Sequence, residues 1–158
     1  SLVIDKPSDE IRIECDLAMF QKALEKVIDN AIKFSPEGSI VRVEISKVIE
    51  QPDNGTTELV KIIVNDEGIG VPEEDLEVIF EKFTQSSRSD DGSGGKGIGL
   101  AISKSIITDH QGTIRAENRQ DKGLSIIIQV PCSQSDVPMD SNQSTELTDF
   151  NKITFKVL

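Results

Sequence analysis

The chain is poor in cations, in cysteine and in long apolar runs, and it has no tryptophan or tyrosine. Its 158 residues hold 17 lysines and arginines against 28 aspartates and glutamates, which gives a formal net charge of −11. This negative charge argues against a nucleic-acid partner. No apolar run is long enough for a membrane span and no signal peptide is present, so we expect a cytoplasmic domain. If the chain is part of a longer parent protein, the sequence leaves open whether that parent has a membrane anchor.

The scarce cysteines and the single histidine carry little chemistry. Cys15 and Cys132 show neither metal-ligand nor redox spacing, so we expect free thiols in a reducing compartment. His110 is the only histidine. It precedes Gln111 and Gly112 at the predicted end of a helix, where a structural cap explains it. The hydrophobic fraction of 36% is ordinary, and the length fits one domain with its own core.

Glycine, in contrast, is concentrated in one segment. Residues 92–99 contain five glycines and lead into an apolar-periodic helix predicted over residues 98–109. Glycine lets backbone N–H groups approach a ligand, and a helix start adds unpaired N–H groups and a positive dipole end. The segment therefore predicts a phosphate site, although a flexible linker has a similar composition. We expect residues 84–96 to be a lid that is mobile without a ligand and ordered with one.

A second pattern places a carboxylate at the end of a strand. A β-rich segment at residues 59–65 is followed by Asp66, Gly68 and Gly70. The Asp66 side chain would repel phosphate but could accept a hydrogen bond from an amine, such as the exocyclic amine of adenine. A β-turn that uses Asp and Gly for their geometry explains the same residues.

A third pattern is a helix predicted over residues 17–34, with Asp16 as its N-cap. Apolar residues recur along it with a 3.6-residue period, and Asn30 and Lys33 lie three residues apart on one polar face. An amide oxygen can bind Mg²⁺, and an ammonium group can contact phosphate. An ordinary solvated face is the alternative.

The remaining periodicity predicts the fold class and the domain limits. We expect a two-layer α/β sandwich, with helices on one face of a mixed, mostly antiparallel sheet, over residues 1–131. Residues 132–158 read as a polar linker or tail. The predicted strands are 11–15, 40–49, 59–65, 113–118 and 124–130, and a short helix is predicted over 72–80.

Four motifs occur in a fixed order. They are K-V-I-D-N-A-I-K-F-S-P from Lys26, D-E-G-I-G from Asp66, I-F-E-K-F from Ile79 and G-G-K-G-I-G-L-A-I-S-K from Gly94. Together they resemble the asparagine, first glycine, phenylalanine and second glycine boxes of the ATP-binding catalytic domain of sensor histidine kinases. That domain belongs to the wider superfamily of gyrase, heat-shock chaperone and mismatch-repair ATPases, with a Bergerat-type fold. The resemblance covers residues 11–131.

The resemblance implies roles for individual residues. Asp66 would bind the adenine amine in a pocket shaped by Gly68 and Gly70. Asn30 would ligate Mg²⁺, and Lys33 would be the catalytic cation at the triphosphate. The other residues expected at the nucleotide are Lys26, Phe80, Arg88, Lys96, Gly97, Ile98, Gly99, Leu100 and Ser125.

Lys26 departs from the family pattern. Histidine kinases usually have asparagine four residues before the position of Asn30, and the hydrolytic relatives have a glutamate that activates water. A protonated lysine cannot act as that base, so we expect a site that holds ATP for transfer. The sequence leaves two alternatives for Lys26: its ammonium group contacts phosphate, or it points to solvent.

The resemblance also implies function and partners. The domain would bind Mg²⁺-ATP and position its γ-phosphoryl group for attack by a histidine of a separate dimerisation domain. That domain would precede Ser1, so we expect a monomeric fragment of a homodimeric parent that does not phosphorylate itself. A response regulator or receiver domain is the expected downstream partner. The alternative is a regulatory nucleotide-binding module without transfer activity.

The C-terminal segment allows two interpretations. After the polar residues 133–149, residues 153–158 become strand-like. They resemble the first strand of a receiver domain, which would make the parent a hybrid kinase. A tail that adds an edge strand to this domain explains them equally well.

Overall fold

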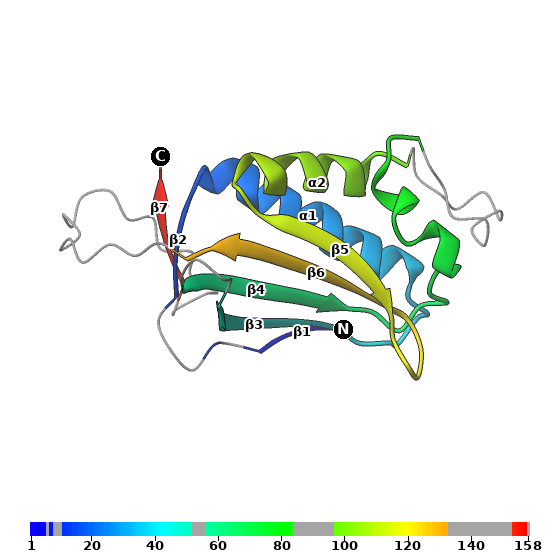
Figure 1. Ribbon diagram of the computed structural model, residues 1–158. Helices are drawn as coiled ribbons and strands as arrows, with labels where there is room; N and C mark the ends of the chain where they lie inside the picture. Colours follow the sequence, from blue (N-terminus) through cyan, green and yellow to red (C-terminus); the bar gives the residue numbers. More distant parts are fainter. Residues whose placement is uncertain (6, 8–10, 52–55, 84–96, 133–152, 158) are drawn as a thin grey trace.

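Two α-helices cover one face of a five-stranded sheet in the computed structural model, which describes residues 1–5, 7, 11–51, 56–83, 97–132 and 153–157 (Figure 1). The elements are β1 (Leu2–Asp5), β2 (Ile11–Cys15), α1 (Leu17–Phe34), β3 (Val41–Glu50), β4 (Thr57–Asn65), α2 (Gly99–Asp109), β5 (Thr113–Asn118), β6 (Leu124–Pro131) and β7 (Ile153–Val157). The strand order in the sheet is β1-β3-β4-β6-β5. Only the β1–β3 pair is parallel among the neighbours in this sheet. The predicted two-layer α/β sandwich is therefore confirmed.

Helix α1 begins and ends where the sequence predicts. The Asp16 side chain accepts a hydrogen bond from the Met19 N–H at 3.0 Å and caps the first turn. Ser35 ends the helix in an extended conformation, as expected for a residue before proline. The apolar stripe is buried against the sheet: Phe20, Ala23, Val27 and Ala31. Among the helices that the structure describes, none is long and apolar enough to cross a membrane.

The side chains of β4 alternate between the two faces of the sheet. Val60, Ile62 and Val64 are buried on the face that the helices cover. Asp66 follows Val64 by two residues, so its side chain lies on the same face just beyond the end of the strand. Across the ladder, Val64 pairs with Ile126 of β6. The sheet therefore places one carboxylate at the edge of an apolar core.

The connection after β4 differs from its prediction. The sequence predicts one short helix over residues 72–80, whereas the structure has two 3-10 turns, η1 (Glu73–Asp75) and η2 (Val78–Phe80). Their backbone hydrogen bonds join residues three apart. Leu76 and Phe80, one from each turn region, both pack against the core.

Two strands lie towards the ends of the chain. β1, which the sequence pattern does not predict, pairs with β3 beginning at Leu2↔Val41. β7 pairs in parallel with β2 in a separate two-stranded sheet, with Val157 opposite Cys15 (Figure 1). In the structure, the C-terminal segment therefore lies on β2 as an added strand.

Both cysteines are free thiols, as predicted. Cys15 is fully buried, and burial, with a smaller effect of Asp16, raises the pKa of its thiol to about 11. The Cys132 thiol donates a hydrogen bond to the Arg12 carbonyl oxygen at 3.4 Å. Cys15 therefore stays protonated and unreactive at neutral pH.

Candidate nucleotide-binding site

Asp66 is a buried carboxylate, and one of its two oxygens accepts hydrogen bonds from the backbone. Its relative exposure is 5%. Oδ1 accepts hydrogen bonds from the Gly68 N–H at 2.8 Å and from the Leu124 N–H at 3.0 Å. Oδ2 receives no hydrogen bond from the residues that the structure describes. The side chain is therefore fixed through Oδ1, and Oδ2 is left for another donor.

Burial also changes the electrostatics of Asp66. Desolvation raises the pKa of Asp66 above its ordinary value, while the hydrogen bonds from Gly68 and Leu124 and the nearby Arg119 guanidinium act in the opposite direction. A carboxylate that stays ionised in this position lacks part of its hydration. A ligand amine that donates to Oδ2 replaces the lost water. The geometry therefore favours an N–H donor over an anion such as phosphate.

Two glycines allow other backbone segments to close around this loop. A Cβ on Gly68 would lie 2.6 Å from the Phe34 carbonyl oxygen, so the loop packs against the last residue of α1. Gly123, with φ of +94°, lies so close to Asp66 that a Cβ would overlap the Asp66 carbonyl oxygen. Neither position accepts a side chain unless the backbone moves. Residues 66–70 are thereby held between α1 and the β5–β6 hairpin.

Asn118, at the end of β5, fixes the far side of the same loop. Its side-chain amide accepts a hydrogen bond from the Val71 N–H at 3.0 Å and donates one to the Val71 carbonyl oxygen at 2.7 Å. Gly70 fits beneath it with φ of +67°, where a Cβ would lie 2.7 Å from Asn118 Oδ1. One side chain therefore satisfies both backbone groups of Val71 and sets the position of the loop.

Arg119 completes this support. Its guanidinium donates a hydrogen bond to the Asp66 carbonyl oxygen at 2.7 Å. Neither Asn118 nor Arg119 stands out in the sequence, because a polar pair before a glycine-containing hairpin turn looks like ordinary turn chemistry. Their role depends on the fold. It brings Asn118 against Val71, which lies 47 positions earlier in the chain, and Arg119 against Asp66, which lies 53 positions earlier.

Asn118→Ala is expected to lower the free energy of unfolding by about 1–3 kcal/mol, because two part-buried backbone groups lose their partner. It should also speed hydrogen exchange at the Val71 amide. Urea unfolding and exchange spectra measure the two effects. Glu73→Gln is the matched control, since it keeps an oxygen acceptor for Asn118, which donates to Glu73 at 3.1 Å. Unchanged exchange at Val71 in Asn118→Ala would show that other contacts hold the loop.

The polar face of α1 presents Lys26, Asn30 and Lys33. Asn30 is partly buried, and its side-chain amide forms no hydrogen bond within the part of the chain that the structure describes. The Lys33 ammonium lies 5.1 Å from the centre of the Phe34 ring. The Lys26 ammonium lies 4.0 Å from the Asp29 carboxylate. The face therefore offers two cations and one amide that has no partner among the described residues.

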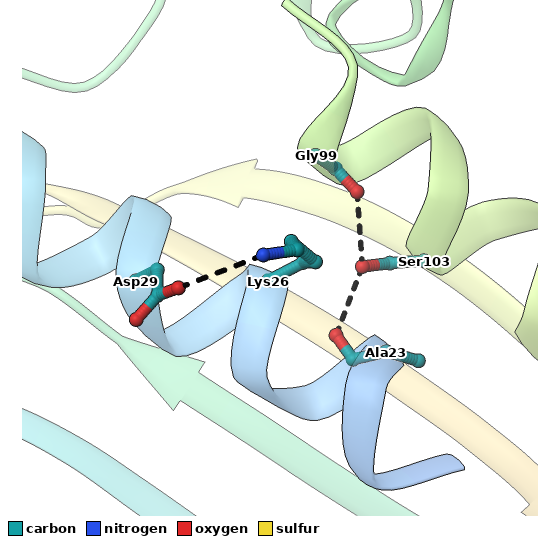
Figure 2. Close-up of polar contacts among 5 residues, drawn as sticks. All are labelled: Ala23, Lys26, Asp29, Gly99 and Ser103. Atoms are coloured by element: carbon teal, nitrogen blue, oxygen red, sulfur yellow. Dashed lines mark hydrogen bonds and ion pairs between the residues drawn. The ribbon is translucent and has the colours of Figure 1, made fainter. Parts of the chain in front are cut away.

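The start of α2 lies opposite this face. The N-cap residue Ile98 makes no side-chain capping bond, and no side chain among the described residues accepts from the first N–H groups of α2. The Phe83 N–H donates to the Gly97 carbonyl oxygen at 2.9 Å. A Cβ on Gly99 would lie 3.9 Å from Lys26 Cδ, which brings α1 next to the start of α2 (Figure 2).

Ser103 joins the two helices beneath this point. It is fully buried, and its Oγ lies 2.9 Å from the Ala23 carbonyl oxygen of α1 and 3.2 Å from the Gly99 carbonyl oxygen of α2 (Figure 2). The hydroxyl is therefore paired in the helix interface and links the start of α2 to α1.

Ser125 is not brought together with Asp66. Its hydroxyl donates to Asn65 Oδ1 at 2.6 Å, and the Asn65 amide donates to Glu44 at 2.7 Å. Side chains alternate along a strand, so Ser125 and Asn65 lie on the sheet face away from the helices. Leu124 lies on the face of Asp66 instead. The placement gives no support to the predicted nucleotide contact of Ser125.

The other predicted residues divide into two groups. Phe80 is buried at 5% exposure, and the Lys104 ammonium lies 5.8 Å from the centre of its ring. Phe80 therefore packs below the site as a core residue. Arg88 and Lys96, together with the predicted lid at residues 84–96, lie outside the described residues.

His110 has both ring nitrogens engaged. Nε2 accepts a hydrogen bond from the Asp16 N–H at 3.0 Å, and Nδ1 lies 2.7 Å from the Ile106 carbonyl oxygen, to which it donates. The ring meets Phe20 edge-on at 5.9 Å. These contacts tie the end of α2 to the start of α1 and support the structural role predicted for His110 over that of a phosphoacceptor.

Comparison with known proteins gives a consistent result. Residues 15–134 match the family of histidine kinase-, DNA gyrase B-, and HSP90-like ATPases. The sensor histidine kinase WalK of Bacillus subtilis is 36% identical over 126 residues, which cover 79% of this chain and 20% of WalK. The mycobacterial sensor histidine kinase MprB has a TM-score of 0.65 at 27% identity, covering 87% of this chain and 84% of that one. The catalytic domain of the histidine kinase ThkA has a TM-score of 0.65 at 28% identity, covering 83% and 79%.

The family match includes every part of the site described above. The chain spans only 20% of the length of WalK, so it corresponds to one portion of such a protein. The matched residues contain the polar face of α1, the loop of Asp66 and the uncapped start of α2. The matched span and the shared fold agree with each other, and on both grounds the chain belongs to the family of histidine kinase-, DNA gyrase B- and HSP90-like ATPases.

Proposed function

We propose that this chain is the ATP-binding catalytic domain of a two-component sensor histidine kinase. It binds Mg²⁺-ATP and presents the γ-phosphoryl group to a histidine on a separate dimerisation domain. The observation that carries the proposal is Asp66, a buried carboxylate whose Oδ1 is saturated by two backbone N–H groups while Oδ2 is left for a donor. The family match and the identity to WalK support the kinase assignment.

We assign adenine to the loop of Asp66. The exocyclic amine donates to Asp66 Oδ2, which is a pairing that phosphate cannot make. Gly68 and Gly70 let the loop pack closely against Phe34 and Asn118, and Asn118 and Arg119 hold the loop in place. The base is thus recognised by a fixed acceptor rather than by a mobile side chain.

We assign the triphosphate to the region between α1 and the start of α2. The N–H groups of residues 97–100 and the positive end of the helix dipole suit an anion. Lys33 and Lys26 bring cations from α1. Because the chain carries a formal charge of −11, this local positive charge has to attract the nucleotide against the overall field.

Asn30 fits a magnesium ligand. Its amide is partly buried and has no partner among the described residues, and an amide oxygen is a ligand that Mg²⁺ accepts. When bound, Mg²⁺ would neutralise phosphate charge beside Asn30. The protein's own contribution is to orient that oxygen on the face that Lys33 shares.

Phosphoryl transfer then depends on positioning and charge neutralisation. A nitrogen of the acceptor imidazole forms a bond to the γ-phosphorus, the bond to the bridging oxygen breaks, and ADP leaves as the imidazole gives up its proton. Residues of this chain hold the triphosphate in line for that attack. Lys26 stands where hydrolytic relatives have a general base, so water is not activated there.

Labelling with γ-³²P-ATP tests this function. The isolated chain is expected to bind Mg²⁺-ATP in a calorimetric titration, to remain unlabelled and to release almost no phosphate. When the histidine-bearing dimerisation domain of the parent, a helical hairpin, is added in trans, the label should appear on this hairpin. The transfer should be slow, because the proximity that a covalent link provides is lost.

Other outcomes would reassign the domain. Binding without any labelling of the hairpin would indicate a regulatory nucleotide-binding module. Rapid phosphate release would place the chain with the hydrolytic ATPases. Acid-labile label on His110 would contradict the structural role of that residue.

The setting of the domain is part of the proposal. We place the ATP-binding domain at residues 1–131, in the cytoplasm, with a response regulator or receiver domain downstream of the parent homodimer. The pairing of β7 with β2 supports the alternative in which the C-terminal segment adds a strand to this domain. The negative net charge supports the absence of a nucleic-acid partner.

A further inference from the structure

Lys26 lies between α1 and the first turn of α2 (Figure 2). A Cβ on Gly99 would lie 3.9 Å from Lys26 Cδ and 4.0 Å from Lys26 Cβ, so the aliphatic stem of the lysine covers the first residue of α2. The ammonium group turns away from α2 and lies 4.0 Å from Asp29 on its own helix. The stem is therefore anchored beside the proposed phosphate site, and only the charged end has to move to reach it.

The contact with Asp29 is weak. The pair is separated by 4.0 Å, and the two side chains are 35% and 61% exposed. Exposed ion pairs of this kind contribute little to stability. The positive end of the α2 dipole also disfavours a cation nearby. An anion at the start of α2 would remove that unfavourable interaction and would offer Lys26 a stronger partner than Asp29.

On the basis of the proposed function, we infer that Lys26 exchanges Asp29 for the triphosphate when ATP binds. We further infer that this exchange makes ATP binding less dependent on Mg²⁺. The asparagine usual at this position in histidine kinases offers an oxygen to a metal but no charge. A lysine cannot ligate a cation, yet its ammonium group neutralises phosphate directly. Lys26 therefore supplies part of the charge that the metal otherwise provides.

Calorimetric titrations of the full chain with ATP, in excess Mg²⁺ and in EDTA, test the inference. Lys26→Met keeps most of the stem and removes the charge. In EDTA it is expected to weaken ATP binding roughly tenfold, the effect of one hydrogen bond to a charged group. In Mg²⁺ the loss should be only about two- to threefold, because the metal screens the same phosphates. The affinity for adenosine, which has no phosphate, should not change.

Three further variants make the test specific. Lys26→Asn should bind ATP with a larger ratio of affinities between Mg²⁺ and EDTA than the natural protein. Asp29→Asn should bind ATP about two- to threefold more tightly in EDTA, because it releases Lys26 from a weak ion pair. Lys22→Met, one turn earlier on the same helix, removes the same charge and should leave all affinities unchanged.

The outcomes separate this inference from the function on which it rests. A natural chain that binds neither ATP nor adenosine would overturn the nucleotide site itself. If the natural chain binds both ligands, but Lys26→Met binds ATP in EDTA as tightly as the natural chain does, only the role of Lys26 would be overturned. A loss in Lys22→Met as large as in Lys26→Met would show a general charge effect and would also contradict the inference.

Discussion

Asp66→Asn is expected to bind ATP about 5- to 150-fold more weakly than the natural chain, the consequence of losing roughly 1–3 kcal/mol from one buried hydrogen bond. The asparagine oxygen can still accept the N–H groups of Gly68 and Leu124, which meet at Oδ1 of the aspartate. The amide nitrogen then takes the place of Oδ2 and presents a donor to the adenine amine. Calorimetric titration at neutral pH measures the loss.

The same substitution should not weaken the fold. Burial raises the pKa of Asp66, so its contribution favours folding below the ordinary aspartate pKa and is lost as pH rises through the raised value. At neutral pH the ionised side chain favours the fold less than an uncharged one would, so Asp66→Asn should unfold at an equal or higher urea concentration. Glu67→Gln, the neighbouring carboxylate, is the control for charge alone. A folded Asp66→Asn variant with unchanged ATP affinity would rule out the adenine contact.

Gly123→Ala is expected to have the largest effect on stability. Its φ of +94° disfavours any side chain, and a Cβ there would lie 2.7 Å from the Asp66 carbonyl carbon and closer still to the oxygen. We expect a loss of about 2–5 kcal/mol, the sum of left-handed backbone strain and overpacking against the backbone. Because Asp66 itself must move, ATP binding should fall as well. Urea unfolding and calorimetry measure the two losses.

Gly38→Ala separates the two causes. Gly38 has a similar φ of +83°, but a Cβ there would have no atom within 4 Å. Its cost should be about 1–2 kcal/mol, from the backbone conformation alone. ATP binding should be unaffected. If the two alanine variants lose the same free energy of unfolding, the close contact between Gly123 and Asp66 contributes nothing to the cost of Gly123→Ala.

Local signals account for what the sequence predicts well. Asp16 and Pro36 mark the two ends of α1, and the stripe between them sets its buried face, so the helix and the placement of Asn30 follow from short-range patterns. The end of β4 and the position of Asp66 follow in the same way from strand alternation and the glycines after it. These features need no knowledge of which segments meet.

Features that depend on non-local pairing were not predictable. β1 is short, and only its parallel pairing with β3 identifies it as a strand. Ser125 meets Asn65 only because β4 and β6 pair in this register. Asn118 gains its role only because β5 ends beside Val71, 47 residues earlier in the chain. Composition and periodicity contain no information on such contacts.

The single hydroxyl of Ser103 has a mechanical consequence for ATP binding. It carries one proton, and two carbonyl oxygens lie within reach, Ala23 O on α1 and Gly99 O on its own helix. When α2 moves slightly along α1, the hydroxyl can turn to donate to the other carbonyl oxygen, so that the buried O–H group keeps an acceptor. The start of α2 can therefore adjust its distance from α1 at low free-energy cost.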